Sequence, residues 1–281
     1  PDSIAADVAV IGGGAAGITM ARRLLAGGRS VVLLESGGLD WENAAADLND
    51  GTNVGQDYYD LIDARLRFFG GTTAIWGGRC AEFDPIDFVR RDWIPHSGWP
   101  FTIDAIRPYY AEARAALGLT PGTPDPSAVH SLLGRFSDDE IVTPLWCFDD
   151  QFDRFSFARC RDIADHPRAT IVTHATVREI VAAPSARTIE RLDVVGFSGR
   201  RLQVRAAHHV LAAGGIEAPR LMLASRSVMP MGTAPLHATL SAASTTADAP
   251  ASHGSSVPTR AGPGPSMARA SARSVPFTRS S

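Results

Sequence analysis

The fold of this chain is indicated by residues 8–17, Val8-Ala9-Val10-Ile11-Gly12-Gly13-Gly14-Ala15-Ala16-Gly17. Four apolar residues, typical of a buried strand, run directly into a glycine cluster, and a helical pattern follows from 15 to 26. Gly27-Gly28 is a signal for a helix C-terminus, and the apolar run 31–35 predicts a second buried strand. The order strand, turn, helix, strand predicts a right-handed βαβ unit in a parallel sheet.

The glycines have the spacing G-x-G-x-x-G, which suits a phosphate group. Gly12 permits a tight turn, Gly14 lets the backbone approach a pyrophosphate, and Gly17 lets helix and strand pack closely. The helix N-terminus adds unpaired N–H groups and a positive dipole end. Glu35 ends the second strand, where a carboxylate can accept hydrogen bonds from the ribose hydroxyls of an adenosine. The alternative is a turn that only joins strand to helix, and the motif alone does not separate FAD from NAD.

The remaining pattern indicates a larger α/β domain with an inserted region. Apolar residues alternate in four short runs, which predicts an antiparallel meander with strands at 170–173, 177–181, 191–195 and 201–204. A last buried run at 209–212 leads into a helix at 216–224. The inserted region, about 84–165, is helical in pieces, with Thr102 and Asp104 as caps. One apolar helix face is predicted from Ile106, Tyr109, Tyr110, Ala113 and Leu117.

Two further clusters of small residues follow the glycine loop. They are Arg67-Phe68-Phe69-Gly70-Gly71-Thr72-Thr73-Ala74-Ile75-Trp76-Gly77-Gly78-Arg79 and Val210-Leu211-Ala212-Ala213-Gly214-Gly215-Ile216-Glu217-Ala218-Pro219-Arg220-Leu221-Met222-Leu223. Two shorter segments lie between them, Asp92-Trp93-Ile94-Pro95-His96-Ser97-Gly98-Trp99-Pro100 and Pro108-Tyr109-Tyr110. Together, these four segments resemble segments of the glucose-methanol-choline (GMC) oxidoreductases. The resemblance is to the sugar and polyol dehydrogenases and pyranose oxidases, and it spans about residues 7–227 in unbroken order.

The resemblance implies FAD as cofactor and oxidation of a hydroxyl group on a sugar, polyol or other alcohol. In the family the first cluster runs along the pyrophosphate towards the isoalloxazine ring, and the second returns a strand to the cofactor. By the same resemblance, backbone groups at Val177 hold the adenine. The residues predicted to contact the cofactor are Gly12, Gly14, Ala15, Ala16, Gly17, Glu35, Ser36, Arg67, Gly70, Gly71, Thr72, Ala74, Trp76, Gly77, Gly78, Val177, Ala212, Ala213 and Gly214.

One position departs from the pyranose-oxidase branch. There, a His before the Trp is bonded covalently to FAD, but this chain has Ile75, which has no nucleophile. The expected cofactor is therefore non-covalent FAD. The resemblance also implies that the catalytic base lies in a C-terminal part after the residues matched here. The eight histidines are most simply surface or packing residues, so no catalytic residue is assigned.

The chain changes character near Val228. Residues 228–281 are dominated by Ala, Ser, Thr, Pro and Gly, a composition typical of disorder, because it buries too little apolar area to offset its ordering entropy. A second hypothesis is a frameshift near Val228, because residues 238–245 can be back-translated so that a neighbouring frame spells a family-like segment. Under either hypothesis, we expect the chain to lack the strands that follow in the resembled family. Sheet surface should then be uncovered, and we expect poor solubility or a partner chain that covers it.

Composition limits the other readings. All 27 basic residues are Arg and the formal net charge is -3, so nothing indicates a nucleic-acid partner or an anionic membrane surface. Cys80, Cys147 and Cys160 are widely spaced, which fits neither a disulfide framework nor a metal site, and they are taken as buried small residues. No run approaches the roughly 20 apolar residues of a membrane span. Without a leader before the first strand, we expect a cytoplasmic protein, or a periplasmic one if a leader was removed.

The sequence thus predicts an α/β protein with two regions. Residues 1–227 are expected to form a Rossmann-like FAD-binding domain, with a parallel sheet plus an antiparallel β-meander, and 228–281 a disordered tail. The expected partners are an alcohol or sugar substrate and an electron acceptor or partner subunit. Two alternatives stay open: a non-catalytic flavin-binding fragment or subunit, and an NAD-dependent or two-dinucleotide flavoprotein reductase. The absence of a second complete G-x-G-x-x-G after a later strand argues against the reductase.

Overall fold

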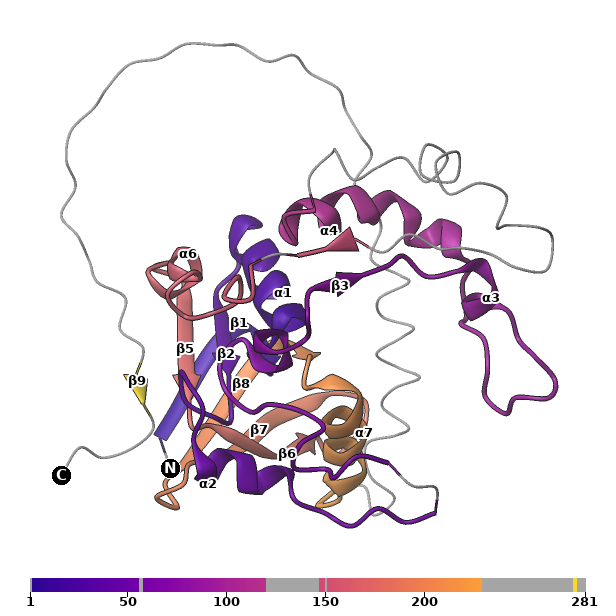
Figure 1. The fold of residues 1–281 in the computed structure, drawn as a ribbon. Helices are drawn as coiled ribbons and strands as arrows, with labels where there is room; N and C mark the ends of the chain where they lie inside the picture. The colour runs from indigo at the N-terminus through magenta and orange to yellow at the C-terminus, as the bar shows by residue number, and fades with distance from the viewer. Residues whose placement is uncertain (1, 56–57, 120–146, 150, 229–274, 277–281) are drawn as a thin grey trace, which may run out of the picture. The chain divides into compact units, whose positions relative to one another are not determined.

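The computed structural model describes residues 2–55, 58–119, 147–149, 151–228 and 275–276 (Figure 1). The chain forms two compact units: the first unit combines Pro1–Thr72 with Phe155–Ser281, and the second unit is Thr73–Arg154. The second unit overlaps most of the inserted region that the sequence indicated at about 84–165, and the bounds of that region stay a prediction. The predicted disordered tail lies almost wholly outside the described residues.

The first unit contains a mainly parallel sheet with antiparallel strands at one side, which confirms the predicted fold class. Within the described residues the strand order is β6-β7-β8-β1-β2-β5-β9. The strands are β1 (Asp2–Ile11), β2 (Val31–Leu34), β5 (Ala169–Thr173), β6 (Thr176–Ala182), β7 (Ile189–Val195), β8 (Arg201–Leu211) and β9 (Val275–Pro276). Strands β8, β1, β2, β5 and β9 pair in parallel, whereas β6 pairs with β7 and β7 with β8 antiparallel.

The register of the central strands brings three chain segments to one edge of the sheet. Ile11 of β1 lies opposite Leu34 of β2 on one side and opposite Leu211 of β8 on the other. All three residues are the last of their strands. Because parallel strands end at the same edge, the segments that follow β1, β2 and β8 start side by side.

Two details of the predicted meander were wrong. The strand at 169–173 pairs in parallel with β2, on the far side of the sheet from β6 and β7. The runs 201–204 and 209–212 belong to one strand, β8, because β1 pairs with it from Leu202 to Leu211. The residues between the two runs are polar or small, so the apolar pattern is interrupted there although the strand is continuous. Apolar patterning does not indicate which neighbouring strand a backbone pairs with.

The residues at the end of β8 are less buried than the sequence predicted. The run 209–212 was predicted as buried, but its residues are only half-buried. Pairing with β7 stops at Val204, so within the described residues the last part of β8 has only β1 beside it. The expectation that missing later strands leave sheet surface uncovered stays a prediction.

Helices cover the parallel strands. The helix α1 (Ala15–Ala26) buries Ile18, Ala21 and Leu25 and packs on β1 and β2, and α6 (Arg161–Ala164) packs on β5 and α1. Gly27 is the C-cap of α1, and its N–H donates to the carbonyl of Arg23. The helix α7 (Gly214–Ala224) packs on β6. Shorter helical turns are α2 (Asn43–Ala46), η1 (Asp47–Asn49) and η2 (Gly71–Ala74).

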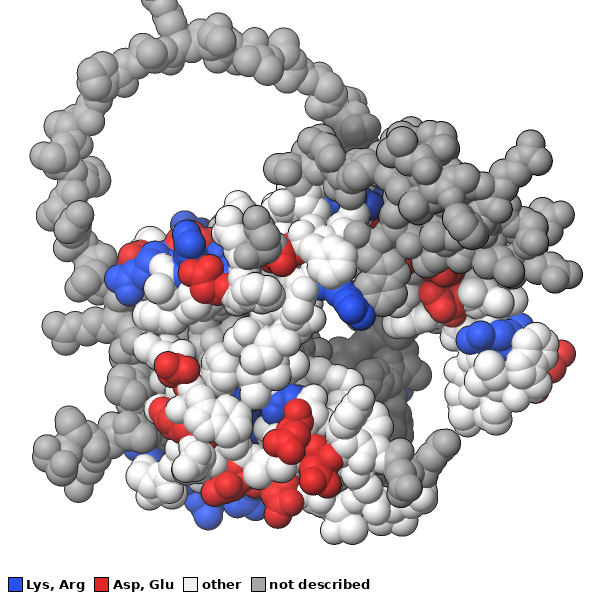
Figure 2. Space-filling view, viewed as in Figure 1, with Lys and Arg blue, Asp and Glu red and all other residues white. Residues whose placement is uncertain are grey.

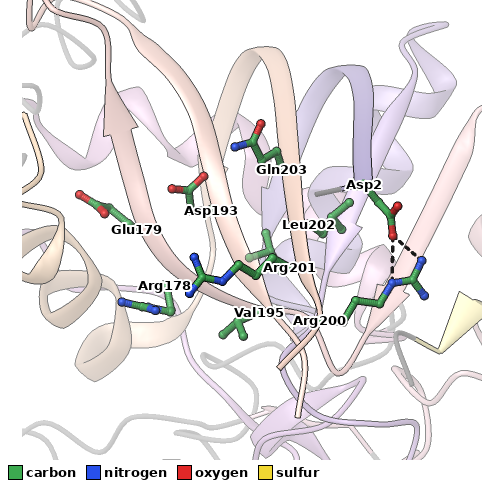
Figure 3. Close-up of a pocket in the computed structure, with 10 residues that line it drawn as sticks. Asp2, Arg178, Glu179, Asp193, Val195, Arg200, Arg201, Leu202 and Gln203 are labelled. Atoms are coloured by element: carbon green, nitrogen blue, oxygen red, sulfur yellow. Dashed lines mark hydrogen bonds and ion pairs between the residues drawn. The ribbon is translucent and has the colours of Figure 1, made fainter. Parts of the chain in front are cut away.

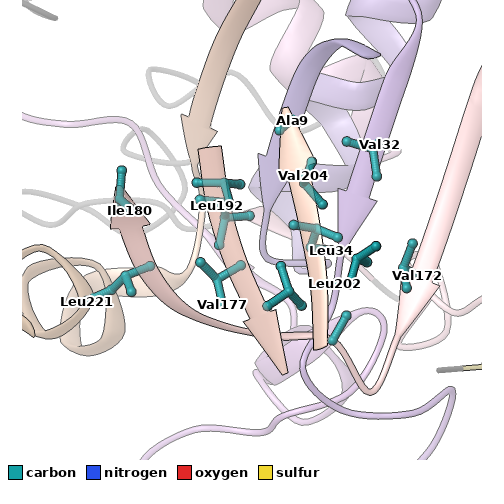
Figure 4. Close-up of a cluster of buried hydrophobic side chains, with 13 residues drawn as sticks. Ala9, Val32, Leu34, Val172, Val177, Ile180, Leu192, Leu202, Val204 and Leu221 are labelled. Atoms are coloured by element: carbon teal, nitrogen blue, oxygen red, sulfur yellow. The ribbon is translucent and has the colours of Figure 1, made fainter. Parts of the chain in front are cut away.

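The main core spans the parallel and antiparallel strands of the sheet. Figure 4 shows Val32, Leu34 and Val172 on one side, and side chains of β6 and β7 on the other. Leu221 of α7 closes the cluster, and Leu192 is fully buried in it. On the other face, Val8, Val10, Val31 and Leu33 are buried too, so both faces of β1 and β2 are covered, as their continuous apolar runs predicted.

The second unit is made of short elements. They are β3 (Arg79–Cys80), α3 (Pro85–Phe88), η3 (Ile103–Ala105), η4 (Arg107–Tyr109), α4 (Tyr110–Ala116) and β4 (Cys147–Phe148). Thr102 is the N-cap of η3 but makes no side-chain cap hydrogen bond, and Asp104, the other predicted cap, lies within η3. The predicted apolar helix face is only partly present: Ile106, Tyr110 and Leu117 are half-buried, but Tyr109 and Ala113 are exposed.

Charged side chains of both signs lie on the visible surface (Figure 2). Several of them pair, for example Arg22 with Asp162 at 2.7 Å and Arg161 with Asp165 at 3.0 Å. Surface pairs of this kind contribute little to stability, at most about 1 kcal/mol each. None of the helices in the described parts of the chain is long and apolar enough to span a bilayer.

Stability should therefore depend mainly on the core. The change Leu192→Ala removes a fully buried side chain and is expected to lower the free energy of unfolding by about 3 kcal/mol. Leu223→Ala is the matched control, because Leu223 is 52% exposed and should lose less than about 0.5 kcal/mol. Urea unfolding followed by circular dichroism measures both, and equal losses would contradict this placement of the core.

Candidate dinucleotide-binding site

The glycine loop after β1 needs its glycines for two distinct steric reasons. Gly12 has a φ of 106°, and a Cβ there would lie 2.5 Å from the carbonyl oxygen of Ala212. A Cβ on Gly17 would collide with the carbonyl oxygen of Gly12. The tight turn and the close packing of helix on strand predicted for these two glycines are therefore present.

The third glycine of the motif has a different environment. A Cβ on Gly14 would meet no protein atom within 4 Å, so open space lies beside the backbone at this point. Gly14 is the N-cap of α1, with extended backbone at φ −80° and ψ −177°, and it offers no side chain to the helix. No acidic residue lies in the first turn of α1. The first turn of α1 thus offers no acidic side chain of its own to the positive end of the helix, which fits a pyrophosphate.

Glu35 holds the loop in place. The side chain is buried, and its Oε2 accepts a hydrogen bond from the Gly13 N–H at 2.8 Å, while Oε1 accepts one from the Gly37 N–H at 2.9 Å. The sequence predicted that Glu35 contacts the ribose, but it did not predict that Glu35 binds main-chain N–H groups of the protein. Each carboxylate oxygen can accept a second hydrogen bond, so ribose contact stays a prediction for Glu35 and for its half-buried neighbour Ser36.

The start of the cluster at 67–79 lies against the glycine loop. The Gly70 N–H donates to the Gly13 carbonyl at 2.8 Å, and a Cβ on Gly71 would lie 3.5 Å from the Gly14 Cα. Both residues have positive φ, 99° and 61°. The Thr72 Oγ1 accepts a hydrogen bond from the Leu66 N–H at 3.1 Å, which closes the segment on itself. The structure therefore brings Gly70, Gly71 and Thr72 to the glycine loop, as a shared binding site requires.

Arg67 links three segments of the first unit. Its Nε donates to Asn49 Oδ1 at 3.0 Å, its Nη1 donates to Ser36 Oγ at 2.8 Å, and its Nη2 lies 3.1 Å from Glu217 Oε1. This role as a connector was not visible in the sequence, which indicated a contact with the cofactor. The cofactor contact stays a prediction.

Glu217, in the first turn of α7, is the centre of a buried ion-pair cluster. Its Oε1 lies 2.7 Å from Arg65 Nη2 and 3.1 Å from Arg67, and its Oε2 lies 2.7 Å from Arg220. Burial opposes ionisation, but the hydrogen bonds and charges of the three arginines outweigh it and lower the pKa of Glu217. Glu217 belongs to the cluster at 210–223, but the sequence did not predict a role for it.

The segment after β8 returns to the glycine loop. The Ala212 N–H donates to the Ile11 carbonyl at 2.8 Å, and Ala213 is the N-cap of α7. Gly214 has a φ of 81°, and a Cβ there would meet no protein atom within 4 Å. Ala212, Ala213 and Gly214 thus lie beside Gly12, with open space at Gly214.

Val177 lies close to Glu35 in the fold, although its side chain belongs to the core. The Ala175 N–H donates to the Glu35 carbonyl at 2.9 Å, and Val177 follows two residues later in β6. The backbone register of β6 with β7 shifts directly after Val177. These features are compatible with a backbone contact to adenine, which stays a prediction.

The remaining predicted residues, Ala74, Trp76, Gly77 and Gly78, belong to the second unit. Trp76 is half-buried and Ala74 is exposed. A Cβ on Gly78 would collide with the Asp149 carbonyl, so the pairing of β3 with β4 is enough to require a glycine there. Cofactor contact for these residues stays a prediction.

Two histidines of the first unit have defined surroundings. His174 Nε2 lies 2.7 Å from Glu42 Oε2. Burial, and to a smaller extent His208, lower the pKa of His209 to about 4, so His209 is neutral at pH 7. His130, His237 and His253 lie outside the described residues. In the part of the chain that is described, no three His, Cys, Asp or Glu side chains gather as a metal site would need.

A cavity of about 620 Å³ lies at the other end of the sheet. It is lined by Asp2 at the start of β1, by Arg178 and Glu179 of β6, and by residues of β7 and β8 (Figure 3). Arg200 and Asp2 form an ion pair at its rim. Because β1 runs from Asp2 to Ile11, this cavity is separated from the glycine loop by the length of the strand.

The fold and the loop define an α/β protein that binds a dinucleotide. The family model described as "FAD dependent oxidoreductase" matches residues 7–271, and the chain therefore belongs to this family. It is an FAD-dependent oxidoreductase domain, and the FAD assignment disfavours the alternative of an enzyme that uses NAD alone.

Individual relatives match parts of the chain. The 6'''-hydroxyparomomycin C oxidase of Streptomyces lividus is 31% identical over 139 residues, which cover 44% of this chain and 24% of that protein. Formate oxidase, at 18% identity and a TM-score of 0.50, aligns over 80% of this chain and 48% of its own. Pyridoxine 4-oxidase from Mesorbium loti, at 20% identity and a TM-score of 0.50, aligns over 78% and 51%. The chain thus spans about half the length of these structures, which show the fold alone.

The Glu217 cluster can be tested through stability. Glu217→Gln leaves three arginines without their shared carboxylate and is expected to cost about 2–4 kcal/mol of unfolding free energy at pH 7. Because the folded-state pKa of Glu217 is lowered, its contribution is present above the unfolded-state pKa and is lost as pH falls through the folded-state pKa. The difference between wild type and variant should therefore shrink in acid.

Urea unfolding at pH 7 and at pH 4 measures this difference. Glu190→Gln is the control, because Glu190 pairs with Arg191 and Arg205 at a more exposed position, where the loss should stay below about 1 kcal/mol. A Glu217→Gln variant as stable as the control would contradict the cluster's role.

Proposed function

We propose that this chain is the flavin-binding part of a GMC-type oxidoreductase that oxidises a CH–OH group of a sugar, polyol or other alcohol. The observation that carries the proposal is the meeting of three glycine-containing segments, around Gly14, Gly70 and Gly214, in the first unit. The resemblance to GMC proteins rests on these same segments in the same order. These segments would hold FAD, which would supply an acceptor for the hydride of the alcohol carbon.

Within the first unit, the contacts follow from the geometry described above. The N–H groups at the start of α1, by Gly14, Ala15 and Ala16, would hold the pyrophosphate beside the open space at Gly14. Glu35 and Ser36 would bind the adenosine ribose, and the Val177 backbone would contact adenine. The segment Ala212 to Gly214 would approach the cofactor from the other side of Gly12.

The proposed substrate class has separate support. The relative from Streptomyces lividus is named for oxidation of a hydroxylated paromomycin, and it is similar to 44% of this chain. A hydroxyl-bearing sugar is therefore a reasonable substrate class to test first.

The length of the relatives limits what this chain does alone. It spans about half of the solved structures that it matches, and the GMC resemblance puts the catalytic base in the other half. We therefore propose that turnover requires a C-terminal part or a partner subunit. The alternative proposal is a non-catalytic flavin-binding subunit.

Gly14 allows a sharp test of cofactor binding. Gly14→Ala should leave the melting temperature nearly unchanged, because its Cβ meets no protein atom and its φ and ψ suit alanine. The same methyl group would intrude on a bound pyrophosphate and weaken FAD binding by at least about tenfold.

Flavin fluorescence titration measures the affinity. Gly27→Ala is the control at the other end of α1, where the added Cβ has ordinary contacts and FAD affinity should stay at the wild-type value. Equal affinity in both variants would exclude the pyrophosphate position proposed here.

The type of FAD attachment and the substrate can be tested with purified protein. Ile75 offers no nucleophile, so acid precipitation should release all of the yellow colour into the supernatant. In an anaerobic mixture with candidate sugars or polyols, bleaching of the flavin absorbance would support oxidation by this chain. The chain alone is expected not to bleach, because the proposed turnover requires a C-terminal part or a partner; bleaching would contradict this requirement and exclude the non-catalytic subunit. Colour retained in the pellet would contradict non-covalent binding.

A further inference from the structure

Two cysteines of the second unit lie directly opposite each other. Strands β3 and β4 pair antiparallel, with Arg79 opposite Phe148 and Cys80 opposite Cys147. Both thiols are free and half-buried. From their wide spacing, the sequence indicated only isolated buried residues, so the fold corrects this interpretation.

The register gives the pair a geometry close to that of a disulfide. The Asp149 N–H donates to the Gly78 carbonyl at 2.8 Å, which makes residues 78 and 149 a hydrogen-bonded pair. Because hydrogen-bonded and non-hydrogen-bonded pairs alternate, Cys80 and Cys147 form the next hydrogen-bonded pair, with Cα atoms about 5.5 Å apart. Disulfides join Cα atoms about 4.4–6.8 Å apart, and side chains opposite each other share one face of the ladder.

The surroundings give the two thiols different properties. Arg114 Nη1 lies 3.5 Å from Cys147 Sγ. Cys80 donates to the Gly78 carbonyl at 3.4 Å, and burial, together with the charge of Asp149, raises its pKa. The raised pKa and the hydrogen bond to Gly78 both keep Cys80 in the thiol form, so Cys80 is suited to react second.

We propose that Cys80 and Cys147 form an intramolecular disulfide when the protein meets a peroxide. The Cys147 thiolate attacks an oxygen of H2O2, which breaks the O–O bond and gives a sulfenic acid and, after protonation, water. The Cys80 sulfur then displaces the sulfenic hydroxyl as a second water, and the S–S bond forms. Two thiols are oxidised and one H2O2 is reduced to two waters, so atoms and electrons balance.

The bond would stabilise the part of the second unit that follows Trp76. Strands β3 and β4 contain two residues each, and ladders this short are marginal without other support. A covalent link would also fix Gly77 and Gly78, which precede β3 and belong to the predicted flavin segment. A hydrogen-bonded pair holds its Cβ atoms somewhat farther apart than a relaxed disulfide does, so the bond should be easy to reduce.

The third cysteine is an internal control. Cys160 lies in the first unit, is fully buried, and has its pKa raised by burial to about 11. It should remain a thiol under conditions that oxidise the pair. The proposal does not depend on FAD or on the proposed activity.

Peptide mapping of the full chain tests the proposal. The protein is treated with H2O2, remaining thiols are blocked with N-ethylmaleimide, and a non-reducing digest is analysed by mass spectrometry. The expected result is one peptide pair joined through Cys80 and Cys147, a loss of two hydrogen atoms per chain, and Cys160 fully alkylated. Dithiothreitol should reverse the change. A joined peptide that contains Cys160, a chain-to-chain link, or two alkylated thiols at 80 and 147 would overturn the proposal.

A stability measurement separates a formed bond from a side reaction. Oxidation should raise the melting temperature of the wild type by about 5 °C. Cys160→Ser should show the same rise, whereas Cys80→Ser and Cys147→Ser should show none. A rise in either of these two variants would mean that another reaction, and not the disulfide, causes the change.

Discussion

The structure depends most on the buried carboxylate of Glu35 and the two main-chain N–H groups that it binds. One comes from Gly13, in the loop between β1 and α1, and the other from Gly37, in the segment after β2. An unpaired carboxylate in this position would be costly, so these hydrogen bonds fix two loops at the same edge of the sheet. The loop that they hold leaves the N-terminus of α1 open at Gly14, and this opening is what a pyrophosphate requires.

Close approach of backbones then assembles the rest of the site. Gly12 lies against Ala212, and Gly70 donates to Gly13, so segments far apart in sequence meet within contact distance of one loop. Glu217 adds an electrostatic tie, because it holds Arg65 and Arg67 against the start of α7. In this FAD-binding domain, glycines therefore let the backbone segments of the site approach one another, and the Glu217 ion-pair cluster holds the segment at 65–67 against α7.

Several surfaces of the chain are more exposed than a self-contained domain would leave them. Val210 and Leu211 lie half-exposed where β8 runs beyond β7, and Trp93 and Tyr109 of the second unit are 78% and 64% exposed. The chain also covers only about half of the structures that share its fold. Both observations bear on the proposal that catalysis requires further polypeptide, since exposed apolar side chains are common where a partner binds.

The sequence by itself determined the βαβ unit and the steric roles of Gly12 and Gly17, because local spacing reports turns, helix starts and buried strands. FAD was predicted from the resemblance to GMC segments, since the glycine spacing alone does not separate FAD from NAD. The sequence could not determine that 169–173 pairs with β2, that 201–211 is one strand, or that Glu35 and Arg67 bind protein groups. Nor could it show that Cys80 faces Cys147. These features depend on pairing between segments distant along the chain, and the tertiary structure alone decides which backbone lies beside which.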